Sequence, residues 1–249
     1  MICVKIKYME AQDLIKKLKQ YSSPARQKSN EWFFKTGQGQ YGEGDKFMGV
    51  TVPNVRLVAR QFLDLSFVEI AKIIKSPIHE IRLTAILILV ERYKRARKNK
   101  DKKLQNKIVV FYLKYSQYIN NWDLVDLSVG YILGQSILDG LESKQILYKY
   151  SKSKNMWERR MSIVATWTFI REGDINDCLK LSKALLKDKE DLMHKAVGWM
   201  LRESWKKDAQ RVENFLEQNY NILPRTTLRY AIEKIKESKR KKILRGKFN

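Results

Sequence analysis

Apolar residues recur along most of this chain three and four positions apart, a spacing that places them on one face of an α-helix. No convincing run of alternating apolar and polar residues, the pattern of a half-buried strand, interrupts them. Helices are expected at residues 11–21, 25–35, 54–62, 66–75, 78–96, 101–119, 122–134, 140–151, 156–171, 175–186, 190–205, 208–219 and 225–238. The sequence therefore predicts an all-α protein.

Proline and glycine mark where these helices begin and where they are absent. Each of the four prolines, Pro24, Pro53, Pro77 and Pro224, precedes an apolar-periodic segment, as suits a residue without an N–H group. Residues 36–46 are rich in glycine, yet no strand precedes them and no Gly-Lys-Ser/Thr follows, so they match neither the dinucleotide-binding fingerprint nor the Walker motif. We expect a flexible loop between helical hairpins; a loop that closely approaches a ligand backbone is the alternative.

Five of the predicted helices align with one another. Their successive offsets are 44, 34, 35 and 34 residues for the segments Ile81–Thr84, Val125–Ser128, Arg159–Ser162, His194–Val197 and Leu228–Ala231. Such a spacing is typical of stacked helix pairs of the HEAT, armadillo or tetratricopeptide kind. We predict a right-handed superhelical solenoid of HEAT-like antiparallel helix pairs. It forms a single domain over residues 1–249 with a basic tail at 238–249, and we expect a monomer.

The charge of the chain points to a polyanionic partner. Fifty Lys and Arg against 27 Asp and Glu give a formal net charge of +23, and nucleic acid is the commonest partner of such a protein. The cations are spread along the chain, which disfavours a membrane-surface helix. The longest apolar stretch, Ala85–Val90, is too short to span a bilayer, and the amino terminus lacks a signal-peptide pattern. We expect a soluble cytoplasmic protein, associated with the nucleoid if the organism is a prokaryote.

Few residues suggest metal or nucleophilic chemistry. Cys3 and Cys178 are far apart in sequence, so neither a disulfide framework nor a thiolate cluster is indicated. His79 and His194 lie in different predicted helices without Cys or acidic residues at ligand spacing. Neither a metal site nor a Ser-His-Asp triad is therefore expected.

One acidic residue interrupts a row of basic ones. The aligned charged position reads Arg82, Asp126, Arg160, Lys195 and Arg229, so equivalent helices are expected to present cations along one surface. Asp126 is the exception. Its carboxylate could stabilise a developing cation or hold a water nucleophile; alternatively, it pairs with a cation of the next repeats and ties the stack together. The sequence leaves both interpretations open.

The tryptophans divide into two groups. Trp122 lies four residues before Asp126 on the same predicted helix face, and Trp199 also lies beside an aligned charged position. The others are expected in the core, because tryptophan at helical spacing usually packs there: Trp32, Trp157, Trp167 and Trp205.

Taken in order, several motifs resemble the AlkD-type DNA alkylation repair glycosylases, a family of HEAT-like repeat proteins. The motifs are Phe47-Met48-Gly49-Val50 followed by Pro53 and Arg56, Asn121-Trp122-Asp123-Leu124-Val125-Asp126, Trp157-Glu158-Arg159-Arg160, and the segment from Lys195 to Glu203. The resemblance covers nearly the whole chain, and the order and spacing of the motifs are more specific than any one of them.

This resemblance implies a DNA glycosylase that releases cationic N3- and N7-alkylated purines from duplex DNA without a cofactor or metal. It makes Asp126, Trp122 and Trp199 the catalytic residues, and it also implies that the base is not flipped into a deep pocket. The residues expected to contact DNA are Arg160, Lys195, Arg82 and Tyr41. Tyr41 is the nearest match to a tyrosine of the family, although the Gly-Glu-Gly-Asp that follows differs in length. A non-catalytic helical-repeat nucleic-acid-binding or scaffold protein is the alternative.

Overall fold

The computed structural model describes residues 9–248, so Cys3 and Asn249 lie outside the described part. Helices make up the regular structure of these residues; apart from one isolated bridge between Lys46 and Ile78, they contain no β-pairing. The predicted all-α class is therefore confirmed. The chain divides into two compact units, Met1–Leu124 and Val125–Asn249, and the boundary falls inside one short helix, α7 (Trp122–Asp126).

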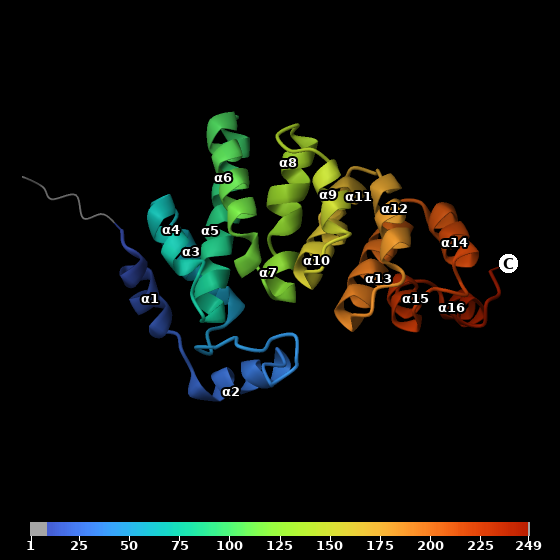
Figure 1. Cartoon of the computed structure of the whole chain (residues 1–249), viewed down its shortest axis with the longest axis horizontal. Coiled ribbons are helices and arrows are strands. Elements are labelled where there is room, and N and C mark those ends of the chain that lie inside the picture. Colours follow the sequence, from blue (N-terminus) through green and yellow to red (C-terminus); the bar gives the residue numbers. More distant parts are fainter. Residues whose placement is uncertain (1–8, 249) are drawn as a thin grey trace, which may run out of the picture. The chain divides into compact units, whose positions relative to one another are not determined.

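The first unit is built around one long helix. Its elements are α1 (Ala11–Lys19), α2 (Pro24–Phe33), α3 (Val52–Gln61), α4 (Phe67–Ile73), α5 (His79–Lys98), α6 (Lys102–Lys114), the short 3-10 helix η1 (Ser116–Tyr118) and the beginning of α7. Every residue of α5 from His79 to Val90 is buried, because α3, α4 and α6 all pack against this helix. Figure 1 shows this bundle, with α2 lying across one end of it.

The second unit is built around α13. Its elements after α7 are η2 (Gly130–Gly134), α8 (Gln135–Leu138), α9 (Gln145–Tyr150), α10 (Met156–Val164), α11 (Trp167–Arg171), α12 (Asn176–Leu185), α13 (Asp191–Trp205), α14 (Ala209–Gln218), α15 (Arg225–Ala231) and α16 (Glu237–Leu244). α13 packs against α10, α11, α12, α14 and α15 (Figure 1). A glycine permits the close approach of α13 to α15: a Cβ atom at Gly198 would lie 2.5 Å from the Cβ of Tyr230 and 2.7 Å from the carbonyl oxygen of Thr227.

Local sequence explains several helix starts. The side chains of Ser23, Thr51, Ser66 and Asp101 each accept a hydrogen bond from a first-turn N–H group, and Pro24 opens α2. One predicted helix is less regular than expected. The segment predicted at 122–134 becomes π-helical at η2, where the hydroxyl of Thr168 donates a 2.6 Å hydrogen bond to the carbonyl oxygen of Gly130.

The basic carboxyl-terminal segment is helical. Most of α16 is exposed, as expected for a solvated segment, but Ile243 is fully buried and anchors it. In the described part of the chain, no helix is long and apolar enough to cross a membrane.

Candidate functional site

Asp126 and Arg160 form a two-pronged ion pair in the second unit. Nε of Arg160 donates to Oδ1 of Asp126 at 2.9 Å, and Nη2 donates to Oδ2 at 2.8 Å. Nη1 of the same guanidinium donates to the backbone carbonyl of Leu192 at 2.6 Å. The end of α7, α10 and the first turn of α13 are thereby connected through one side chain. Of the two interpretations left open by the sequence, pairing of Asp126 with a neighbouring cation is observed.

Burial differs between the two partners. The Asp126 side chain keeps 16% of its surface accessible, whereas that of Arg160 keeps 6%. The expected phosphate contact by Arg160 is therefore unsupported, because its guanidinium is buried and directed at Asp126 and Leu192. Arg160 is placed instead to orient the Asp126 carboxylate.

α13 carries two further predicted residues. Lys195 and Trp199 lie four positions apart, one helical turn, so they share a face of α13. Trp199 is half-buried, and Lys195 forms an ion pair with Asp191 at 2.7 Å while its side chain stays 38% exposed. The carbonyl that binds Arg160 belongs to Leu192 in the first turn of the same helix, so α13 is directly connected to the Asp126–Arg160 pair.

Trp122 belongs to an aromatic cluster of the first unit. Its ring stacks on Phe34 with centroids 5.4 Å apart and meets Phe33 edge-on at 6.0 Å. Phe34 also stacks on Phe47 at 5.0 Å and contacts the ring of His79 at 4.9 Å. The sequence analysis missed Phe33 and Phe34, because neither lies in one of the five aligned helix segments.

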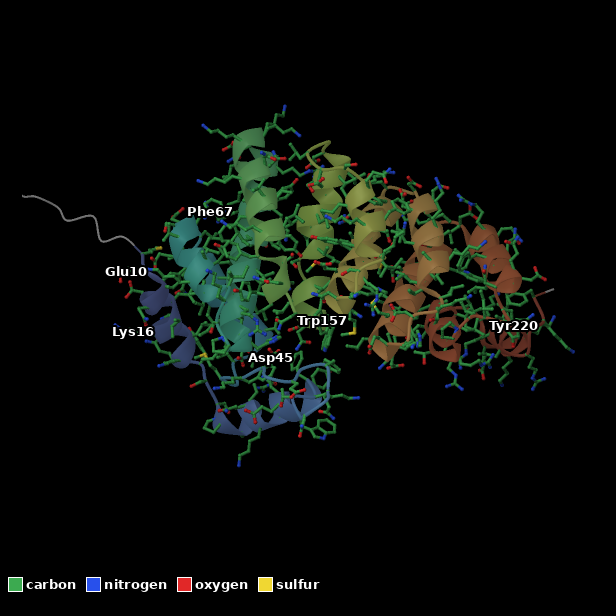
Figure 2. All side chains as sticks on the ribbon, viewed as in Figure 1. Glu10, Lys16, Asp45, Phe67, Trp157 and Tyr220 are labelled. Atoms are coloured by element: carbon green, nitrogen blue, oxygen red, sulfur yellow. The ribbon has the colours of Figure 1, made fainter. Side chains whose placement is uncertain are left out.

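A buried polar network lies next to this cluster. His79 lies between two carboxylates, with Nδ1 3.2 Å from Oδ2 of Asp45 and Nε2 2.9 Å from Oδ2 of Asp123. Asp45 also accepts hydrogen bonds from Arg82 Nη2 at 2.6 Å and Asn121 Nδ2 at 2.9 Å. Asp45, labelled in Figure 2, lies on the loop that follows α2. The network therefore joins this loop to the first turns of α5 and α7.

The charges of this network reinforce one another. Burial disfavours a charged imidazole, but Asp123 and Asp45 outweigh it and raise the pKa of His79 to about 9. Burial alone would raise the pKa of Asp45, yet hydrogen bonds from His79 and Asn121 and the charge of Arg82 hold it below its usual value. We infer an imidazolium between two carboxylates at neutral pH.

The network also fixes the start of α7. Asn121 uses its Oδ1 to accept the backbone N–H of Trp122 at 2.8 Å while its Nδ2 reaches Asp45. Asp123, the second residue of α7, is a partner of His79. Acidic partners of His79 were missed because they lie 34 and 44 residues away in sequence.

Three sequence predictions differ from the structure. Arg82 is 3% exposed and bound to Asp45 and the carbonyl of Ser76, so it does not belong to an exposed row of cations. Trp32, expected in the core, is 82% exposed. Trp157, Trp167 and Trp205, also expected in the core, are each half-buried.

Tyr41 is half-buried and donates from its hydroxyl to the carbonyl of Phe33 at 3.2 Å, next to the aromatic cluster.

Within the described residues, no group of three or more His, Cys, Asp or Glu side chains is arranged to hold a metal ion. The carboxylate of Asp45 is instead bound by Arg82 and Asn121 as well as by His79.

Comparison with known proteins gives a consistent result. The family model described as DNA alkylation repair enzyme matches residues 14–235. Among solved structures, the chain is similar to a predicted DNA alkylation repair enzyme from Enterococcus faecalis, with a TM-score of 0.67 and 17% sequence identity. The match covers 87% of this chain and 97% of that one, and at this identity it supports the fold. No curated protein gave a significant match.

Proposed function

Because the chain belongs to the DNA alkylation repair enzyme family, we propose that it is a DNA glycosylase. Its substrates would be cationic N3- and N7-alkylated purines in duplex DNA, hydrolysed at the N-glycosidic bond without flipping the base into a deep pocket. The observation that carries the proposal is the partly accessible Asp126 carboxylate, held by Arg160 at the end of the helix that begins with Trp122. Family membership makes DNA the partner, and we propose that the protein acts as a monomer.

The substrate explains why one carboxylate suffices. An alkylated purine already carries a positive charge, so it can leave without protonation by a strong general acid. The sugar that remains has oxocarbenium character, and a carboxylate stabilises such a cation and directs water to it, as in glycosidases. Asp126 would perform both tasks. Arg160 would fix the positions of both oxygens, which a bidentate guanidinium does better than an ammonium.

The tryptophans would supply selectivity for cations. An indole face attracts a positive charge by about 0.5 to 2 kcal/mol per contact. Trp122 is one turn before Asp126 on α7, and Trp199 is on the α13 face that also carries Lys195. Because an unmodified purine is neutral, it gains less from these rings. Lys195 and other exposed cations would contact phosphates and make binding sensitive to salt.

The test is release of free methylpurine from alkylated duplex DNA. We expect release by the wild type and a loss of at least about a hundredfold in Asp126→Asn. The chain offers a matched control, since Arg159 holds Asp188 through a similar pair at 2.6 and 3.2 Å. Asp188→Asn should keep release, because it disturbs a neighbouring ion pair of the same kind. No release by the wild type overturns the proposal.

The pairing of Asp126 with Arg160 also favours a second candidate, a non-catalytic nucleic-acid-binding or scaffold protein in which this pair is structural. A salt titration distinguishes a nucleic-acid-binding protein from a protein scaffold. Duplex affinity that falls steeply with salt indicates phosphate binding, whereas an affinity that is low and insensitive to salt favours a protein scaffold.

A further inference from the structure

Helix α2 exposes two large aromatic side chains. Trp32 is 82% exposed and Phe33 is 55% exposed. No residue of α2 is buried. An ordered helix that buries none of its own residues cannot be explained by core packing. We call Trp32 and Phe33 the aromatic pair of α2.

The surroundings hold this helix in place. At its start, the side chain of Ser23 caps the helix, and the N–H of Ser23 donates to the carbonyl of Met48 at 3.3 Å. At its end, the ring of Phe34 stacks on Phe47, and the hydroxyl of Tyr41 binds the carbonyl of Phe33. The exposure of the aromatic pair is thus a feature of a fixed surface.

The aromatic pair is continuous with Trp122 of the first unit. Phe33 meets the ring of Trp122 edge-on at 6.0 Å, so aromatic surface extends from solvent at Trp32 to the first residue of α7. Lys28 precedes Trp32 by four positions and shares its face of α2. Arg26, Lys28 and Lys35 are all exposed. Aromatic rings interleaved with cations are the combination by which proteins stack on bases and hold phosphates.

We propose that the aromatic pair of α2 contacts the bases of duplex DNA beside the lesion, with Lys28 and Lys35 on the neighbouring phosphates. This inference rests on the proposed function, because it takes damaged duplex DNA as the occupant. Apolar side chains inserted at a base step unstack it, and a step weakened by damage opens at lower cost than an intact one. Charge complementarity favours DNA here over an apolar protein surface, since three exposed cations accompany the two rings.

The experiment uses the full-length protein and a duplex with a tetrahydrofuran abasic-site analogue next to 2-aminopurine. Binding by the wild type should change the 2-aminopurine fluorescence, because that base loses its stacking partners. Trp32→Ala should bind this duplex on the order of tenfold more weakly, without the fluorescence change. Trp32→Phe should restore most of both signals. Val68→Ala, at a 68% exposed apolar residue of α4, is the control for loss of surface apolar area and should behave as the wild type.

The possible results distinguish failure of the proposed DNA contact from failure of the glycosylase proposal. If Trp32→Ala binds with unchanged affinity and fluorescence while the wild type releases alkylpurine, this inference is wrong and the glycosylase proposal stands. If the wild type releases no alkylpurine but the fluorescence change depends on Trp32, the DNA contact stands and the glycosylase fails. A change of sedimentation mass from dimer to monomer in Trp32→Ala, with DNA affinity unaltered, overturns the inference in favour of self-association.

Discussion

Arg160 holds both carboxylate oxygens of Asp126, and its third hydrogen bond ends on the carbonyl of Leu192. The carboxylate is therefore fixed in one orientation by a guanidinium that is itself fixed by the first turn of α13. The positive charge of Arg160 also reduces the net attraction of Asp126 for a cation. Accurate placement of the two oxygens, more than total charge, is then what this pair contributes to the proposed reaction.

Replacement of Arg160 by lysine tests this role. Arg160→Lys keeps the charge but cannot form two parallel hydrogen bonds to Asp126, so single-turnover release of alkylpurine should fall about a hundredfold. Duplex affinity should change little, because Arg160 is buried. The matched variant Arg159→Lys loosens the Asp188 pair and should retain release. Equal losses in both variants would indicate a general structural effect.

The charge state of His79 predicts how stability depends on pH. Its pKa is about 9 in the folded protein, against 6.5 for an ordinary histidine. The stabilisation from the protonated form is thus complete below pH 6.5 and is lost as the pH rises through 9, about 3 kcal/mol in all. Chemical denaturation at pH 6.5, 8 and 9.5 should show this decline. His79→Gln should be less stable at pH 6.5 and should lack the decline; an equal decline in this variant would assign it to other groups.

The sequence was sufficient to predict helices, because their backbone hydrogen bonds join residues that are close in sequence. The 3.6-residue periodicity predicted the helices, whereas the assignment of Asp126, Arg160 and Trp122 to a site, which rests on an ordered set of motifs, stays a prediction. Local pattern could not show what the side chains contact across the fold. His79 looked isolated because its partners Asp45 and Asp123 are 34 and 44 residues distant, and Trp32 looked like a core residue because periodicity does not reveal that α2 packs at the edge.

The π-helical turn at η2 illustrates the same limit. It was predicted as regular helix, but Thr168, 38 residues away, binds the carbonyl of Gly130. No signal within residues 122–134 indicates that contact.

Gly198 should tolerate no larger residue. The Cβ atom of Gly198→Ala would lie 2.5 Å from the Cβ of Tyr230 and 2.7 Å from a backbone oxygen of α15, so α13 and α15 must separate. We expect destabilisation of about 1 to 3 kcal/mol, measured by urea denaturation. Gly37→Ala meets only the flexible side chain of Gln40 and should have little effect. If Gly198→Ala is as stable as the wild type, the two helices are not closely packed.

Lys195 and Arg82 occupy the same aligned position of the repeats, but their neutralisation should have different effects. Loss of the Lys195 charge should weaken duplex binding, whereas loss of the Arg82 charge should lower stability. Lys195 is 38% exposed, so Lys195→Gln should weaken duplex binding and lower the slope of log K against log salt by about one, with little change in stability. Arg82 is buried with its guanidinium on Asp45, so Arg82→Gln should cost about 3 to 5 kcal/mol of stability, since it removes one of the two charged partners of that buried carboxylate. Its salt slope, measured at a temperature where the variant is folded, should equal that of the wild type. A reduced slope in Arg82→Gln would place Arg82 among the phosphate contacts after all, and an unchanged slope in Lys195→Gln would remove Lys195 from them.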